Sequence, residues 1–207
     1  VSPGSHPLLA NNFAVKIDAG RHVLISGSEA KRTRNGFGLG SNLGGQPPGE
    51  DIVLERCLSH DNGAADQAAG VFIGGALDVA IRNCIFWGHH PSPAAGQGAI
   101  TYFSNQTGLP STVAIQNNTF YGNRLPDIVV FPAPNLTVVV ENNIFHRSGI
   151  AGGFLSAAGA APIVDSDYNQ FYISGGDASS AAFAVGAAND GFLQWQAHGQ
   201  DAHSVFL

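Results

Sequence analysis

The chain has 207 residues, of which 44% are hydrophobic and 12% are charged, and its formal net charge is −6. This length suits one domain, and so few charged residues disfavour long solvated helices and favour short strands joined by tight turns. Lys16 and Lys31 are the only lysines, which argues against nucleic-acid binding, and no run of about 18 apolar residues could span a membrane.

The first 50 residues contain glycine-rich and proline-rich stretches at positions 36–40 and 44–49. We therefore expect this part to form irregular, loop-rich first coils. The basic cluster 31–34 is interpreted as a solvated loop rather than a phosphate site. Because the chain contains no methionine, we expect it to be a processed form or an excised part of a longer protein.

A repeat begins near residue 51 and continues to residue 172. Segments 79–86, 113–120, 138–145 and 164–171 align on one phenylalanine each, and segments 52–59 and 22–28 match more weakly. Within each segment, apolar residues alternate with polar ones, which is typical of a strand. A period near 26 residues with two or three strands per turn predicts a β-solenoid of about six coils, stacked about 4.8 Å apart.

The alignment predicts columns of residues that lie above one another on successive coils. We expect Phe86, Phe120, Phe145 and Phe171 to stack inside the core. The column two residues earlier is expected to form an amide ladder. Its members are Ser28, Cys57, Cys84, Asn118, Asn143 and Asn169. Because the two cysteines lie on neighbouring coils, they form either two buried thiols or one disulfide.

The C-terminal part, residues 173–207, is expected to close the solenoid. Residues 189–199 favour a short helix with Asn189 as the N-cap and Gly199 just beyond the last turn. Such a helix would cover the open edge of the last coil, which would otherwise invite aggregation.

The Asn-Asn-x-Phe segments, Gly70-Val-Phe-Ile-Gly74, the run 167–172 and the tail 195–204 resemble the pectin-lyase-like right-handed parallel β-helix proteins. The tail is similar to those of uncharacterised secreted bacterial members. The resemblance implies an all-β fold, one domain over 1–207 (with parts 1–50, 51–172 and 173–207), a secreted or cell-surface location and a polysaccharide partner. In such relatives another strand follows the segment Asp-Ala-His-Ser, so we expect this chain to stop early.

The fold alone leaves the function open, and the paired aspartates, Gly-His-Gly and Arg-Ile-Lys typical of polygalacturonases are missing. The residues that follow the phenylalanine position form a ring-bearing outer column, either a platform for sugar rings or an exterior ladder. The predicted substrate-binding residues are Trp87, Tyr121, Tyr172 and His89. The predicted catalytic residues, suited to neutralising a uronate and removing its proton, are His60, Asp61, His146, Arg124 and Arg147.

Two interpretations therefore stay open. One is a polysaccharide-active enzyme, in which a lyase of an acidic glycan is favoured over a glycoside hydrolase. The other is a noncatalytic carbohydrate-binding or cell-surface adhesion solenoid. No cofactor is required by the sequence, although Asp165 and Asp167 alternate on one strand and could hold Ca²⁺. The sequence does not determine an oligomeric state.

Overall fold

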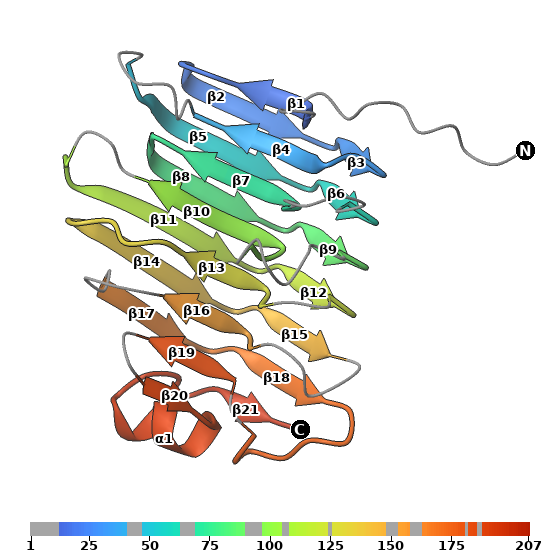
Figure 1. The fold of residues 1–207 in the computed structure, drawn as a ribbon, viewed down its shortest axis with the longest axis vertical. Coiled ribbons are helices and arrows are strands. Elements are labelled where there is room, and N and C mark those ends of the chain that lie inside the picture. Colours follow the sequence, from blue (N-terminus) through green and yellow to red (C-terminus); the bar gives the residue numbers. More distant parts are fainter. Residues whose placement is uncertain are drawn as a thin grey trace, which may run out of the picture.

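The chain winds into a coil whose successive turns stack along one axis (Figure 1). A computed structural model describes residues 13–40, 47–62, 69–89, 97–104, 108–123, 126–147, 153–157, 163–180, 182–185 and 188–207. The described strands follow one another in groups of three, six groups before the C-terminal end, and strands one turn apart pair in parallel. This is the parallel β-helix that the repeat predicts.

Three sheets run the length of the molecule. The eight-stranded sheet contains β1 (Phe13–Ile17), β4 (Asn35–Leu39), β7 (Val71–Gly74), β10 (Ile100–Ser104), β13 (Ile128–Val130), β16 (Leu155–Ala157), β19 (Phe183–Val185) and β20 (Ala188–Asp190). The six-stranded sheet contains β2 (Arg21–Ser26), β5 (Gly49–Glu55), β8 (Ala76–Arg82), β11 (Ser111–Gln116), β14 (Leu136–Glu141) and β17 (Ile163–Asp167). The seven-stranded sheet contains β3 (Glu29–Lys31), β6 (Leu58–His60), β9 (Ile85–Trp87), β12 (Thr119–Tyr121), β15 (Ile144–Arg147), β18 (Gln170–Ile173) and β21 (Val205–Phe206).

The phenylalanine column lies inside the core, as predicted. Phe86, Phe120, Phe145 and Phe171 pair in register across β9, β12, β15 and β18, and all four are buried. Their ring centroids are 5.2, 4.8 and 5.1 Å apart in order along the column. Stacked rings at this spacing add ring–ring attraction to the burial of apolar surface.

The asparagine ladder is also confirmed, at the turn between the six-stranded and seven-stranded sheets. The backbone N–H of Asn118 donates to Oδ1 of Asn143, and the N–H of Asn143 donates to Oδ1 of Asn169, both at 2.9 Å. Each Nδ2 also donates to a carbonyl of the preceding coil, as Asn143 does to Ile115 at 2.8 Å. The buried turn thus satisfies its polar groups from one coil to the next.

The two cysteines occupy the same ladder as free, buried thiols. The backbone N–H of Cys57 donates to Sγ of Cys84 at 3.4 Å, and the N–H of Cys84 donates to Oδ1 of Asn118 at 2.9 Å. Burial raises the pKa of Cys84 to about 12. Of the two alternatives that the sequence left open, the structure has the pair of thiols.

The residue before each ladder position explains the Asn-Asn doublets. Asn83, Asn117 and Asn142 have φ angles of 56°, 57° and 55°. This left-handed backbone conformation turns the chain sharply, and asparagine adopts it more readily than most other residues. In the doublets 117–118 and 142–143, the first asparagine therefore makes the turn and the second makes the ladder, and Asn83 makes the same turn before Cys84.

Within residues 13–40 and 47–50, the first coils are more regular than expected from their glycine and proline content; residues 1–12 and 41–46, which include part of the stretch 44–49, lie outside the described residues. Strands β1, β2, β3 and β4 lie within residues 13–40 and pair in register with the next coil. The glycines at positions 36 and 38 lie inside β4, where side chains would meet neighbouring atoms: a Cβ at Gly38 would lie 2.7 Å from the ring of Phe13. Close packing, rather than an irregular loop, accounts for these glycines.

At the C-terminus, a helix closes the last coil as predicted. Helix α1 (Phe192–Ala197) buries Phe192 and Trp195, and the ring of Trp195 stacks on Phe183 at 5.0 Å. Gly199, with φ of 81°, follows the C-cap residue His198. The predicted N-cap was wrong: Asn189 lies in β20, which pairs antiparallel with β19, and the helix begins after Gly191.

Candidate functional site

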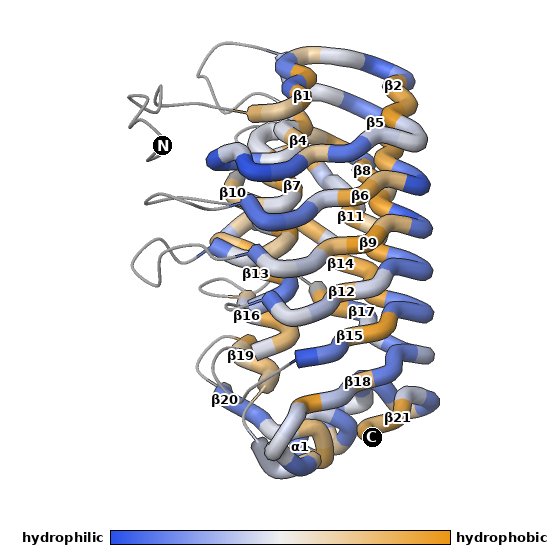
Figure 2. Tube along the Cα trace, turned by 90° about the vertical axis from the view of Figure 1, so that its right-hand side faces the viewer, coloured by the Kyte–Doolittle hydropathy of each residue, from blue (hydrophilic) through white to orange (hydrophobic). Residues whose placement is uncertain are grey.

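The ring-bearing residues form one column on the outer surface of the seven-stranded sheet, which faces the viewer in Figure 2. His60 stacks on Trp87 with centroids 3.9 Å apart and an interplanar angle of 6°. Farther along, His146 lies between Tyr121 at 4.9 Å and Tyr172 at 4.5 Å. The rings therefore cover parts of one another's faces, and Tyr121 is 53% exposed.

A second outward row, which the sequence reasoning missed, runs beside the ring column. It contains exposed aliphatic side chains: Ile85 is 42%, Ile144 is 44% and Val205 is 51% exposed. Each lies two residues before a column position, so strand alternation turns both rows outward and the phenylalanines between them inward. The same alternation could have identified this row from the sequence. The complete row is Glu29, Leu58, Ile85, Thr119, Ile144, Gln170 and Val205. We call the two rows together the ring face.

His60 is held between two carboxylates. Its Nδ1 lies 2.9 Å from Oδ2 of Asp61, and its Nε2 lies 2.9 Å from Oε1 of Glu29. The hydrogen bond with His60 is the main cause that lowers the pKa of Glu29 and also that of Asp61. Because both ring nitrogens already have partners, neither is available to remove a proton from a substrate. The catalytic roles predicted for His60 and Asp61 stay predictions.

Arg147 lies inside the β-helix rather than on the ring face, so its predicted surface position was wrong. It is among the largest fully buried side chains and donates to the backbone carbonyls of Asn123, at 3.1 Å, and Gly153. The reason is alternation along β15: His146 points outward, and Arg147 points inward in register with Ile173. Arg124, the other predicted arginine, lies outside the described residues.

His89 is buried as well, whereas the sequence placed it beside the column on the surface. Its backbone N–H donates to Oδ1 of Asn123 at 3.1 Å, and Nδ2 of Asn123 donates to Oδ1 of Asp127 at 2.8 Å. Burial raises the pKa of Asp127 to about 6, against the opposing effects of Arg147 and Asn123. This buried polar cluster organises the turn between the seven-stranded and eight-stranded sheets, and His89 does not reach the ring face.

One member of the predicted calcium pair, Asp167, has its carboxylate engaged by a histidine, and calcium binding by the pair stays a prediction. Both oxygens of Asp167 face His203, which donates its backbone N–H to Oδ1 at 2.7 Å and places its ring Nδ1 2.6 Å from Oδ2. Burial acts to raise the pKa of Asp167, but the hydrogen bonds from His203 and Tyr168 hold it below its ordinary value. Among the described residues, no group of three His, Cys, Asp or Glu side chains could hold a metal ion.

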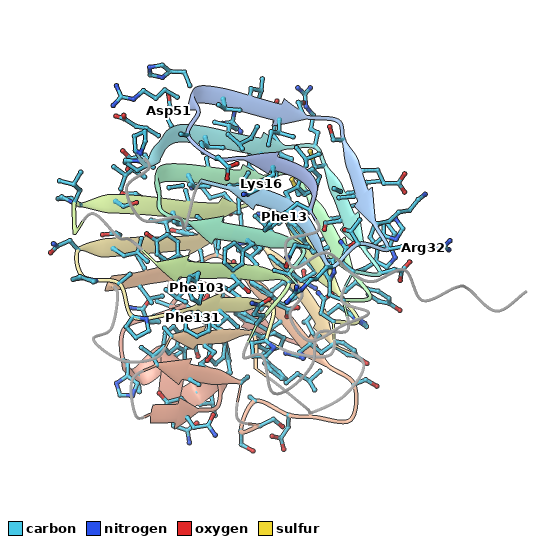
Figure 3. All side chains as sticks on the ribbon, turned by 45° about the horizontal axis from the view of Figure 1, so that its top comes forward. Phe13, Lys16, Arg32, Asp51, Phe103 and Phe131 are labelled. Atoms are coloured by element: carbon cyan, nitrogen blue, oxygen red, sulfur yellow. The ribbon has the colours of Figure 1, made fainter. Side chains whose placement is uncertain are left out.

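Another aromatic row lies on the outer surface of the eight-stranded sheet, and the sequence reasoning missed it too. Neighbouring ring centroids of Phe13, Phe72, Phe103 and Phe131 are 6.1, 5.6 and 5.3 Å apart. Figure 3 labels Phe103 and Phe131 next to each other, and Nζ of Lys16 lies 5.8 Å from the ring of Phe13. Phe103 is 41% exposed, so this row is a rival surface to the ring face.

With this geometry in place, the family follows from a comparison. Residues 10–186 match the family model described as "Right handed beta helix region". The chain belongs to this family. A right-handed β-helix agrees with the pectin-lyase-like resemblance of the sequence. No curated protein and no solved structure matches the chain. The comparisons therefore show the family and its fold, and they assign no activity.

The β-helix therefore presents a ring face and a phenylalanine row on two different sheets. The ring face carries hydrogen-bonding groups, the phenol hydroxyls and Thr119 and Gln170, beside its apolar surface. The phenylalanine row has apolar rings alone. Within the part of the chain that the structure describes, no helix is long and apolar enough to cross a membrane.

Proposed function

We propose that the protein binds polysaccharide along the ring face. The observation that carries this proposal is the register: Trp87, Tyr121, His146 and Tyr172 lie one per coil on consecutive strands. Because the stacked rings cover parts of one another's faces, sugar rings would pack against the outward ring edges and the exposed aliphatic side chains, and the hydroxyls beside them would supply hydrogen bonds. A chain lying along the solenoid axis would meet one such position about every 4.8 Å. An extracellular location, expected from the family resemblance, would bring the protein to such a partner.

Binding is favoured over catalysis because two of the predicted catalytic groups are occupied. His60 is held by Glu29 and Asp61, and the guanidinium of Arg147 is buried on backbone carbonyls. A glycoside hydrolase needs two facing carboxylates across the bond, and the outward residues that the structure describes on β9, β12, β15 and β18 contain none. A lyase is the second candidate, favoured by His146 between its two tyrosines.

Affinity electrophoresis in gels that contain soluble polysaccharides tests the proposal. We expect the wild-type protein to be retarded by at least one glycan, and Trp87→Ala and Tyr121→Ala to migrate faster than the wild type in that gel. Leu24→Ala is the matched control, because Leu24 is 60% exposed on the six-stranded sheet. Circular dichroism spectra establish that the variants are folded.

Two results would overturn the proposal. If no polysaccharide changes the migration of the wild-type protein, a structural or adhesion role for the solenoid becomes the better interpretation. Retardation that both ring substitutions leave unchanged would place the binding surface elsewhere. An ultraviolet-absorbing unsaturated product, formed with an acidic glycan and lost in His146→Ala, would instead establish the lyase.

A further inference from the structure

We infer that the ring face selects a neutral polysaccharide rather than an acidic one. This inference rests on the proposed function and concerns the ligand of the same face. Its basis is the distribution of charge. Among the described residues, the outward positions of β9, β12 and β18 are uncharged, and β15 adds only the histidine of the column. These positions are Ile85, Trp87, Thr119, Tyr121, Ile144, His146, Gln170 and Tyr172.

The charges of the ring face gather at one end and compensate one another. Nζ of Lys31 lies 3.1 Å from Oε1 of Glu29, and the same carboxylate contacts His60. Asp61 faces His60, and the positive charge of Arg32 also acts on it. At the end of the face formed by β3 and β6, the acids Glu29 and Asp61 are thus paired with basic side chains.

Three of the described arginines near the face, Arg56, Arg82 and Arg147, have other partners. Arg82 and Arg56 both contact Glu55, at 2.9 and 2.6 Å, on the side of the six-stranded sheet. Arg147 is buried and bound to backbone carbonyls. A polymer of uronates would bring about one negative charge per coil past β9, β12, β15 and β18, where the outward residues that the structure describes include no lysine or arginine. The protein behind it has a net charge of −6.

A neutral chain suits the same surface. The aliphatic row and the ring column offer apolar contact on every coil from Ile85 to Tyr172, and Thr119 and Gln170 interrupt the aliphatic row with hydrogen-bonding groups. Contact with neutral sugar rings needs no charge, so its affinity should depend little on salt. The occupant that the ring face fits is an extended neutral glycan whose residues follow the coil spacing.

A pair of substitutions at one exposed position tests the sign of the ligand's charge. Ile144→Lys and Ile144→Asp place opposite charges in the middle of the ring face at an exposed side chain. Both proteins are run in gels that contain a neutral glycan (hydroxyethylcellulose, xyloglucan or galactomannan) or an acidic one (alginate, pectate or hyaluronan). Each gel is run at low and at high salt, and Phe103→Ser controls for the rival phenylalanine row.

We expect the wild type to bind a neutral glycan with little salt dependence, and both substitutions to weaken that binding to a similar degree, by about tenfold. Phe103→Ser should bind like the wild type. Salt-sensitive binding of an acidic glycan that Ile144→Lys strengthens and Ile144→Asp weakens would overturn the inference and leave the proposed function standing. Loss of binding in Phe103→Ser alone would move the site to the eight-stranded sheet and overturn both.

If the wild type binds no glycan, the proposed function and the inference of a neutral ligand are both overturned. Light scattering tests whether the ring face instead binds a second copy of the chain. A dimer that both Ile144 substitutions convert to monomers, in a protein that binds no glycan, would show that the ring face is a protein interface.

Discussion

The carboxylate of Asp201 accepts a hydrogen bond from the indole Nε1 of Trp195 at 2.6 Å, inside the C-terminal cap. The same carboxylate accepts from Ser166 at 2.7 Å, Asn169 at 2.9 Å and Ser204 at 2.5 Å. Asp201 is fully buried. One side chain thus joins the capping helix, the end of the asparagine ladder and the last strand of the six-stranded sheet.

Asp201→Ala should therefore destabilise the whole cap. Removal of the carboxylate leaves four buried donors without their acceptor, at about 1–3 kcal/mol for each unsatisfied group before relaxation. We expect a loss of at least about 3 kcal/mol in the free energy of unfolding, measured by urea denaturation. As a control, Asp18→Ala at an exposed position should change the free energy of unfolding by less than about 1 kcal/mol. An unchanged midpoint in Asp201→Ala would contradict the role of this residue.

The ladder predicts an unusual tolerance at Asn143. Cys57 and Cys84 make equivalent ladder contacts with their sulfur atoms. Asn143→Cys should therefore be less destabilising than Asn143→Ala. The alanine variant loses every side-chain hydrogen bond of the ladder at this position, which costs about 2–4 kcal/mol of unfolding free energy. Thermal unfolding of the two variants compares them. Equal melting temperatures would show that side-chain hydrogen bonding at this position contributes little.

The two thiols should be unreactive in the folded protein. Burial raises the pKa of Cys84 to about 12, so almost no reactive thiolate forms near neutral pH. We expect iodoacetamide to modify neither cysteine in the native state and both in denaturant, as counted by mass spectrometry. Rapid native labelling would show that the ladder opens readily at this turn.

Asp127 should make stability depend on pH. Its folded pKa of about 6 exceeds the ordinary value of an aspartate, so the folded state keeps its proton longer than the unfolded state. Stability is therefore lost as pH rises from about 4 to 6, by roughly 3 kcal/mol, and Asp127→Asn does not titrate. The unfolding free energy of the variant relative to the wild type should rise by this amount between pH 4 and pH 7. A difference that is constant with pH would contradict the buried carboxylate.

The fold was readable from the sequence because every coil repeats the same physical requirement. The inward Phe86 and Phe120, and the ladder residues Asn118 and Asn143, recur at one place in each repeat, and stacking brings them into register. The ring column could be predicted for the same reason. Residue type alone could not place Arg147 or His89, because a charged or polar side chain suggests a surface position. Strand alternation buries Arg147, and the turn after β9 buries His89.

Other features could not be predicted because they depend on contacts between residues far apart in the sequence. Phe13, Phe72, Phe103 and Phe131 lie in strands of the eight-stranded sheet or next to them, with a weaker repeat, so nothing local in the sequence groups them. Likewise, the antiparallel pairing of β19 with β20 shortened the C-terminal helix. Such contacts depend on which coil lies next to which, and the spacing between repeats varies.

The central claim, that polysaccharide lies on the ring face, is tested most directly by the fluorescence of the two tryptophans. Trp87 is half-buried on the ring face, whereas Trp195 is 4% exposed in the cap, so acrylamide should quench mainly Trp87. A polysaccharide that retards the protein in gels should protect this fluorescence from acrylamide. Unchanged quenching at a polysaccharide concentration that saturates binding would show that the chain binds elsewhere and would contradict the proposed site.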